Sequence, residues 1–445
     1  MEENQNNNLS NLSPVPKGIR DILPEDHQYL TYIKKVARHR SRQGGFRRIA
    51  TPMMEREEFI TAIHGKNSDL VKNNLYKFKD PEGNDMVLRP EGYSGIIRAY
   101  LAHEMKDWPQ PIELYYIEPY FEFVPQEKKQ FYRSYMEFGA VSIGEKAAAL
   151  DAQLIYLAHK ILQDLNIESL FQLQINHLGC EVCRPKYLMD LENYFVGKER
   201  SLCFSCQEKV ANNPHYIFRC HEEDCQILSE LAPKVNNYWC EDCSKFYNRL
   251  RSYLEALEIS YRENLGLVGK YDFYTGLVFE YWDRDQKKEN ILLHGGSFDE
   301  VIGKISGEKI PAVGFNMRLE KAIKAMKKEK IKVPSKDNLQ VFIAQLSREA
   351  KKKCLQLMIS LREAGIKAIG VLGKGSIREQ ITLAEKFKVP YMIIMGLTEV
   401  RENIIILRDM KVGQQKVISY DDAVDVIKKL VGEENLDTYT EGELG

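Results

Sequence analysis

Two long runs, IELYYIEPYFEFV (112–124) and FYRSYMEFGAVSIG (131–144), decide the fold of the larger part of the chain. Both are rich in aromatic and β-branched residues, which favour extended strands, and a short polar segment separates them. Shorter runs of the same type come before them (FRRIATP, MVLRP) and after them (LVFEYW, ILLHGG, AVGFNM). The pattern predicts a broad antiparallel β-sheet.

Helices are expected to flank this sheet. One is predicted to begin after Pro24 and to end at the Gly44–Gly45 pair. Another follows the two long strands, where apolar residues recur every three or four positions from Leu150 to Leu165. Residues 14–331 are therefore assigned to one α+β domain, in which helices cover an antiparallel sheet.

A separate C-terminal domain is predicted over residues 337–432, after the polar linker KVPSKDN. Strand patterns there alternate with helices expected over 348–363 and 376–387, which indicates a small α/β domain with a mixed sheet. Residues 1–13 are interpreted as a disordered leader and residues 433–445 as an acidic tail, because both are polar and poor in apolar residues.

Charge and hydropathy limit the possible partners. The 445 residues include 63 Lys and Arg against 64 Asp and Glu, a formal net charge of −1. Any contact with RNA must therefore come from local basic patches, and no contact with DNA is expected. No membrane span is predicted, since no run of eighteen uncharged apolar residues is present. Residues 1–10 lack the pattern of a signal peptide, so a cytoplasmic location is expected.

Eight of the nine cysteines lie within residues 177–250 and form close pairs along the chain. The pairs are Cys180/Cys183, Cys203/Cys206, Cys220/Cys225 and Cys240/Cys243. Disulfides are rare in a reducing compartment, whereas four cysteines make a tetrahedral zinc site. The segment is predicted to be an insertion that binds two structural zinc ions, with the pairing on each ion left open. The alternative is a set of free core thiols, which is also the interpretation given to Cys354.

Seven segments, in this order, resemble those of histidyl-tRNA synthetases, a class II family. They are VPKGIRDILPED (15–26), GFRRIATPMMEREEF (45–59), LRPEG (88–92), ELYYIEPYF (113–121), DFYTGLVFE (272–280), GGSFD (295–299) and PAVGFNMRLE (311–320). Two further segments resemble the anticodon-binding domain of that family, namely GKGSIREQITLAEKFKVPY (373–391) and LRDMKVGQQ (407–415). The resemblance implies a class II antiparallel sheet and tRNA binding through the C-terminal domain. It also implies a homodimer built partly on the family's first motif, which is GFRRIATPMME (45–55) in this chain.

The positions that the resemblance assigns to ATP differ from the family pattern. Activation joins an amino-acid carboxylate to the α-phosphate of ATP, so the site needs fixed cations and usually magnesium. Glu122 stands where the family has a phosphate-binding arginine, and Arg318 stands at the glycine on which adenine would lie. In the family's third motif, which is GFNMRLEK (314–321) in this chain, Lys321 stands where the family has a final arginine. Lysine keeps the positive charge but loses the bidentate geometry.

Gly269 stands where the family's histidine-specific segment has a catalytic arginine. Lys128, Lys129 and Lys270 are candidates for compensating cations. Lys270 would need a shift of register, which in a strand turns a side chain to the other face. The catalytic residues are therefore left unassigned.

The positions that the resemblance assigns to histidine are partly kept. Four residues match the family's substrate-binding positions: Glu91, Glu137, Asp272 and Tyr274. Neighbouring positions are changed, since Tyr93 replaces a threonine, Val141 replaces a glutamate, and Phe298 replaces a tyrosine. Glu137 itself replaces a glutamine.

These changes favour a paralogue that has lost most or all histidine activation but keeps the dimeric scaffold and the binding of tRNA or a small ligand. The first alternative is a working histidine–tRNA ligase, which converts ATP, L-histidine and tRNA into histidyl-tRNA, AMP and pyrophosphate. Only this alternative requires ATP and magnesium. The second alternative is a regulatory subunit of ATP phosphoribosyltransferase, and the presence of a C-terminal domain counts against it.

Overall fold

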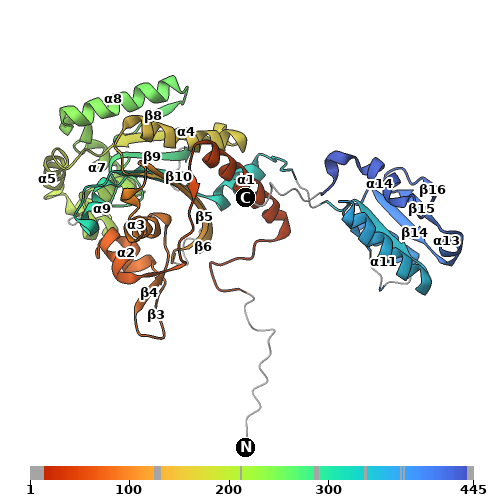
Figure 1. Ribbon diagram of the computed structural model, residues 1–445. Coiled ribbons are helices and arrows are strands. Elements are labelled where there is room, and N and C mark those ends of the chain that lie inside the picture. The colour runs from red at the N-terminus through yellow and green to blue at the C-terminus, as the bar shows by residue number, and fades with distance from the viewer. Residues whose placement is uncertain are drawn as a thin grey trace, which may run out of the picture. The chain divides into compact units, whose positions relative to one another are not determined.

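The computed structural model describes residues 15–124, 132–210, 213–284, 290–334, 338–370, 373 and 376–437. The chain divides into two compact units, residues 1–333 and 334–445 (Figure 1). The predicted leader lies outside the described residues, as does most of the predicted tail, which begins with a short 3-10 helix, η8 (Glu433–Asn435). In the part of the chain that is described, no helix combines the length and apolar character needed to cross a bilayer.

A sheet of eight strands, counted over the described residues, forms the centre of the first unit. Its order is β1 (Arg47–Arg48), β5 (Ile112–Phe121), β6 (Ser134–Ile143), β11 (Ala312–Arg318), β10 (Ile291–Ser297), β9 (Thr275–Asp283), β7 (Phe171–His177) and β8 (Tyr261–Glu263). The outermost strand on each side runs parallel to its neighbour, and all other pairs are antiparallel. The predicted pairing of the two long strands is confirmed, since β5 and β6 pair from Ile112 opposite Ile143 to Phe121 opposite Ser134.

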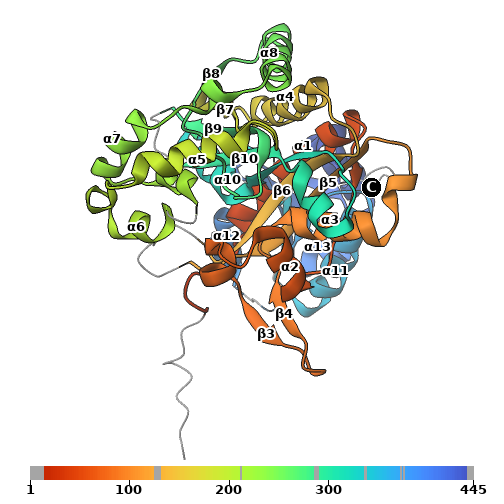
Figure 2. The ribbon, with the colours of Figure 1, turned by 90° about the vertical axis from the view of Figure 1, so that its left-hand side faces the viewer.

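Helices cover both faces of this sheet. One face packs against α1 (Pro24–Gln43), α4 (Ala148–Asp164), α8 (Glu241–Ala256) and α10 (Leu319–Lys328) in a continuous apolar core. The other face packs against α2 (Glu57–His64), α3 (Gly92–Ala102) and α9 (Asp299–Ser306) in a second core. Figures 1 and 2 show α4 and α8 on one side of the sheet and α2 and α3 on the other. The α+β fold class, with helices flanking an antiparallel sheet, is confirmed.

A small sheet and short helices complete the body of this unit. The small sheet has the order β2 (Met54–Arg56), β4 (Asp85–Leu88) and β3 (Lys77–Lys79). Three short helices lie outside the main layers: η2 (Leu70–Asn74), η3 (Met105–Asp107) and η4 (Glu168–Leu170).

The cysteine-rich segment lies between β7 and α8. It consists of short helices: α5 (Arg184–Phe195), η5 (Glu199–Ser201), α6 (Phe204–Val210), η6 (Pro214–Arg219), α7 (Glu223–Leu231) and η7 (Val235–Tyr238). Its buried residues join the second core, beside Leu267, Tyr271 and Phe273 of the loop that leads into β9. The insertion therefore packs against the same side of the sheet as α3.

The second unit contains a mixed sheet, which has five strands among the residues described. Its order is β13 (Ala368–Ile369), β12 (Val341–Gln345), β14 (Tyr391–Met395), β15 (Ile404–Asp409) and β16 (Gln415–Ser419). The first three strands are parallel and the last two join antiparallel, as predicted for a mixed sheet. Helices α11 (Arg348–Glu363) and α12 (Ile377–Lys386) lie within one residue of their predicted bounds. Three elements of this unit were not predicted from the sequence: β16, α13 (Leu397–Glu402) and α14 (Ala423–Val431).

Candidate functional site

A row of polar side chains crosses the face of the large sheet that packs on α3. The strand register places Tyr116 of β5, Gly139 of β6, Asn316 of β11, His294 of β10 and Glu280 of β9 side by side. Residues paired on adjacent strands project to the same face, and the four side chains in this row are buried. We call this surface the polar face and include in it Glu137 and Arg318, which are paired in the next row.

Glu122, just beyond the end of β5, is neutralised by cations from other parts of the chain. Its Oε2 atom lies 2.5 Å from Nη2 of Arg318 and 3.7 Å from Nζ of Lys270. Its Oε1 atom accepts a hydrogen bond of 3.3 Å from the amide of Asn74. Burial raises the pKa of the Glu122 carboxyl, but Lys270 and Arg318 outweigh burial and lower the pKa to about 2. Two departures from the family pattern, Glu122 and Arg318, therefore satisfy each other.

The guanidinium of Arg318 is held from a second direction by an aromatic ring. Its Cζ atom lies 3.8 Å from the centre of the Tyr135 ring, a geometry that favours a cation–π contact. Tyr135 is buried and its hydroxyl donates to the carbonyl of Pro90 at 3.0 Å. The Arg318 side chain is thus fixed between Glu122 and Tyr135.

Lys270 contacts this pair directly, which corrects the expectation from register. Residues 267–274 form a loop rather than a strand, so the alternation of faces does not apply to them. Gly269 has φ of +73°, and a Cβ atom there would lie 2.7 Å from Cδ2 of Tyr274. An arginine at this position would be strained and obstructed, whereas Lys270 reaches Glu122 without either difficulty. The other two candidates, Lys128 and Lys129, lie outside the described residues.

Lys321 is a half-buried cation near the ion pair of Glu122. Its ammonium donates to the carbonyl of Ile291 at 2.6 Å, and burial together with the nearby Arg318 and Lys270 lowers its pKa to about 7. The buried Glu280 accepts from Nε1 of Trp282 at 2.6 Å, and burial raises the pKa of its carboxyl to about 7.

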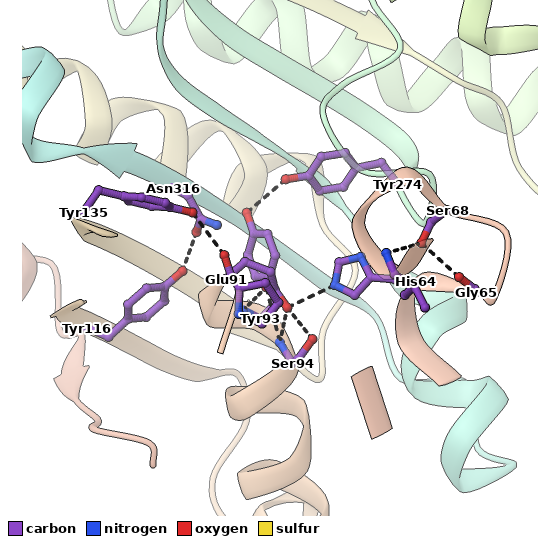
Figure 3. Close-up of polar contacts among 12 residues, drawn as sticks. His64, Gly65, Ser68, Glu91, Tyr93, Ser94, Tyr116, Tyr135, Tyr274 and Asn316 are labelled. Carbon is purple, nitrogen blue, oxygen red and sulfur yellow. Dashed lines mark hydrogen bonds and ion pairs between the residues drawn. The ribbon is translucent and has the colours of Figure 1, made fainter. Parts of the chain in front are cut away.

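Glu91 makes contacts with both α3 and α2. It caps the N-terminus of α3, where it accepts from the backbone N–H of Tyr93 at 2.5 Å and of Ser94 at 3.1 Å, and from the hydroxyl of Ser94 (Figure 3). Its Oε1 atom also lies 3.1 Å from Nε2 of His64. Burial opposes ionisation, but the contacts with His64 and Ser94 give the carboxyl a lowered pKa.

An aromatic cluster fills the space beside Glu91. Tyr93 is fully buried, and its hydroxyl accepts from that of Tyr274 at 3.2 Å (Figure 3). Its ring lies 4.8 Å from that of Phe298 and 6.0 Å from those of Tyr271 and Phe273. A large ring therefore stands where the resemblance has the small side chain of threonine.

Glu137 is a buried carboxyl whose two oxygens have no hydrogen-bond partner among the described residues. Burial raises its pKa to about 8, so it is largely protonated at neutral pH. Three nearby atoms are likewise without a partner within the described chain: Oη of Tyr271, Nε2 of His294 and Nδ2 of Asn316. The other amide atom of Asn316, Oδ1, accepts from the hydroxyl of Tyr116 (Figure 3).

Three of the four residues predicted to bind substrate come together, and the fourth does not. Glu91, Glu137 and Tyr274 lie at the polar face, where their charges and hydroxyls interact. Asp272 is exposed and accepts from Nη1 of Arg219 at 2.8 Å, so it faces the cysteine-rich insertion instead. Their roles toward a substrate stay predictions.

The eight paired cysteines gather in two groups of four within the described residues. The outer thiolate centre consists of Cys180, Cys183, Cys240 and Cys243, and the inner thiolate centre consists of Cys203, Cys206, Cys220 and Cys225. The sulfur atoms of each group lie within 4.8 Å of one another. The first pair along the chain thus joins the last, and the two middle pairs join each other, which the spacing alone left open.

The distances within each group suit a tetrahedral metal. Sulfur–sulfur distances of 3.7 Å and 3.8 Å occur in the outer centre, and one of 3.7 Å occurs in the inner centre. Four sulfurs at ~2.3 Å from a zinc ion would be ~3.8 Å apart. Backbone N–H groups also point at the sulfurs, from Cys180 to Cys183 at 3.3 Å and from Cys203 to Cys225 at 3.2 Å.

A separate cleft of about 540 Å³ lies between α2 and the hairpin of β3 and β4. Side chains of both charges line it, among them Glu57, Lys66, Lys72, Lys77 and Asp85. It includes none of the residues of the polar face. The mixed charges give this cleft no preference for an anion or a cation.

Comparison with known proteins identifies the family. A family model described as histidyl-tRNA synthetase matches residues 18–181 and 219–322, and a model of the anticodon-binding domain matches residues 340–430. A histidine–tRNA ligase of Dehalococcoides mccartyi is 34% identical over 417 residues, which is 94% of this chain and 99% of that protein. The chain belongs to the histidyl-tRNA synthetase family. The synthetase model does not match residues 182–218, which contain Cys183, Cys203 and Cys206.

Solved structures of the same family share the fold. The apo histidyl-tRNA synthetase of Staphylococcus aureus has a TM-score of 0.77 and 27% identity, with 94% of this chain and 100% of that chain covered. A Bacillus halodurans structure titled as an ATP phosphoribosyltransferase regulatory subunit/histidyl-tRNA synthetase has a TM-score of 0.61. At 21% identity, with 86% of this chain and 98% of that chain covered, it supports the fold alone.

The raised pKa of Glu137 predicts a stability difference that depends on pH. Glu137→Gln should be more stable than the parent by a margin that grows from pH 5 to pH 8. The folded pKa of about 8 exceeds the ordinary 4.5, so the folded parent loses stability as pH rises between these values. The margin should reach a few kcal/mol, at ~1.4 kcal/mol per unit of pKa.

Urea unfolding at three pH values in this range would measure that margin. Glu58→Gln, at an exposed position, is the matched control and should show almost no change with pH. A difference for Glu137→Gln that stays constant across the range would contradict the assignment.

Proposed function

We propose that this protein is a histidyl-tRNA synthetase paralogue with lost or much reduced histidine activation, which keeps the dimeric scaffold and the ability to bind tRNA or a small ligand. The ion pair of Glu122 with Arg318 carries this proposal. A carboxylate at the phosphate-binding position repels the α-phosphate of ATP. The guanidinium beside it is already neutralised by Glu122 and stacked on Tyr135.

The residues present therefore do not fit ATP. Glycine commonly occurs where a ligand approaches the backbone closely, and the Arg318 side chain fills that space here. Loss of one transition-state charge contact typically costs ~2.7–4 kcal/mol, or 10²–10³ in rate. Effects of residues that act together do not add simply. The changes at Glu122, Gly269 and Arg318 nevertheless all lower the rate of the same step, the activation of histidine by ATP.

The changes around the amino-acid position point the same way. The buried ring of Tyr93 takes up volume next to Glu91, and Glu91 is occupied by His64 and the cap of α3. Val141 offers no partner for an imidazole N–H, and Phe298 lacks a hydroxyl. A histidine side chain thus loses both space and hydrogen-bond partners.

Histidine-dependent exchange of pyrophosphate into ATP should be undetectable or very slow in the purified protein. The double substitution Glu122→Arg with Arg318→Gly should tighten ATP binding by about tenfold or more, because it restores a cation at position 122 and removes the side chain at position 318. Each single change should fail, since it leaves either two arginines together or a buried carboxylate without its guanidinium. Glu58→Gln, at an exposed position, makes the net charge more positive by the same amount as the double change and controls for it.

A parent exchange rate on the order of 1–10³ s⁻¹, the usual range for enzymes, would overturn the proposal. Gly269 is left unchanged in this experiment, because its backbone does not accommodate an arginine.

The alternative of a working ligase has one specific support. Relatives named histidine–tRNA ligase match almost the whole chain, including one from Caldicellulosiruptor saccharolyticus at 30% identity over 418 residues. In this alternative Lys270 and Lys321 supply the missing positive charge, and the reaction uses ATP and magnesium. The regulatory-subunit alternative is weaker, because residues 340–430 match the anticodon-binding domain.

Zinc is proposed as a structural metal in both thiolate centres. All four ligands of each centre are cysteines, so no coordination position is left for a substrate. Elemental analysis of protein purified without chelator should give about two zinc ions per chain. Cys203→Ser with Cys220→Ser should lower this to about one, and Cys354→Ser, at the core thiol, should leave it unchanged. Metal near zero together with eight reactive thiols would refute the proposal.

A homodimer is proposed through the surface around the first motif. Met53 and Met54 are each 53% exposed there, and Trp108 is 40% exposed with its ring 5.4 Å from the guanidinium of Arg47. Exposed apolar groups of this size often mark protein interfaces. The exposed face of this motif supports an interface between two copies.

The C-terminal unit is proposed to supply most of the affinity for tRNA. Arg378 and Lys411 are exposed there, and Lys374 lies outside the described residues. The double change Arg378→Ala with Lys411→Ala should weaken tRNA binding and reduce the slope of log K against log salt by about one to two. Lys352→Ala, at an exposed position on α11, is the control. Unchanged affinity and slope in the double variant would count against this surface.

A further inference from the structure

The loop of residues 269–274 connects the polar face with the cysteine-rich insertion. Lys270, Tyr271 and Tyr274 contact groups at the polar face, whereas Asp272 points toward the insertion. Two arginines of the insertion hold the backbone of this loop. Each of them is the chain neighbour of a cysteine in a thiolate centre, with Arg184 after Cys183 and Arg219 before Cys220.

Arg219 joins the inner thiolate centre to the first half of the loop. Its Nε atom donates to the carbonyl of Gly269 at 2.9 Å, and its Nη1 atom donates to Asp272 at 2.8 Å. The amide of Asn213 donates to the same carboxylate oxygen at 2.9 Å. Three hydrogen bonds from the insertion therefore hold the loop on either side of Lys270, one at a backbone carbonyl and two at the Asp272 carboxylate.

Arg184 and the backbone beside it join the outer thiolate centre to the second half of the loop. Nη1 of Arg184 donates to the carbonyl of Tyr274 at 3.1 Å. The N–H of Gly276 donates to the carbonyl of Gly179 at 3.1 Å, and the N–H of Leu178 donates to the carbonyl of Gly276 at 2.6 Å. Gly179 directly precedes Cys180, so the start of β9 is bonded to the residue next to a ligand of the outer centre.

The insertion is built from short helices whose buried residues pack into the second core. Its helices α5, α6 and α7 have 12, 7 and 9 residues, and helices of this length are marginal in water without tertiary support. Binding of a metal by four thiolates contributes directly to folding free energy in small domains. Loss of metal should therefore loosen the segments that carry Arg184 and Arg219.

We propose that metal bound at the two thiolate centres positions the 269–274 loop through Arg184 and Arg219, so that metal occupancy controls the arrangement of the polar face. The inference rests on the zinc occupancy proposed above. Arg184 and Arg219 are positioning residues, because they act on the loop backbone and not on a ligand. Asp272 accepts the hydrogen bonds through which Arg219 and Asn213 attach the loop to the insertion.

Hydrogen–deuterium exchange on the full-length protein tests this proposal. With zinc retained, Arg219→Met should speed exchange in residues 269–276 by about tenfold, and Arg184→Met should act mainly on residues 274–276, because each removes bonds to the loop. Arg219→Lys should recover part of the protection by keeping the charge near Asp272. Arg200→Met, exposed in the same insertion, is the matched control, and strand β12 is the internal reference.

Removal of zinc from the parent should speed exchange in residues 269–276 as much as the two arginine changes together, with β12 unchanged. A zinc-loaded protein whose loop exchanges equally before and after metal removal would overturn this inference alone. A protein that contains no metal and still protects the loop would overturn both this inference and the zinc proposal. Zinc-loaded arginine variants that exchange like the parent would show that the loop is held by other contacts.

Discussion

A buried charge must be paired or neutralised, and this requirement governs the polar face of the large sheet. Glu122 is neutralised by Arg318 and Lys270. Glu91 accepts hydrogen bonds at the N-terminus of α3, and its Oε1 atom lies 3.1 Å from Nε2 of His64. Among the residues that the structure describes, the two carboxyl oxygens of Glu137 have no hydrogen-bond partner, and burial raises the pKa of this carboxyl to about 8. The contacts of Glu122 and Glu91 thus hold their side chains in place, whereas no hydrogen bond from the described residues holds the carboxyl of Glu137.

The 269–274 loop makes ion pairs in two directions. Lys270 brings a positive charge to the carboxylate of Glu122, and Asp272 takes a positive charge from Arg219 of the insertion. The loop is thus held to the sheet by the positive charge of Lys270 and to the insertion by the negative charge of Asp272. A change at either end would be felt at the other, because only a few residues of backbone separate them.

The parts of the structure that follow from local sequence pattern were predictable, and those that depend on distant contacts were not. Helices α1 and α11 follow from capping residues and apolar spacing, and β5 with β6 follows from two adjacent strand-type runs. The contact of Lys270 with Glu122 could not be predicted, because strand alternation says nothing about a side chain in a loop. The grouping of the cysteines depends on how the insertion folds back, which spacing does not encode. The pairing of Glu122 with Arg318 did leave a signal: opposite charges had changed together at two pocket positions.

Alternation along the strands explains how the site could change while the fold remained. On β6, Phe138 and Ala140 pack in the core beneath α1 and α4, whereas Glu137 and Val141 face the other side. On β11, Phe315 and Met317 belong to the same core, and Asn316 and Arg318 alternate with them. Side chains of successive residues point to opposite faces, so a substitution at the polar face leaves the packing of the first core intact. The strands therefore retain the family fold with one set of side chains, while the side chains on the other face are free to depart from the family pattern.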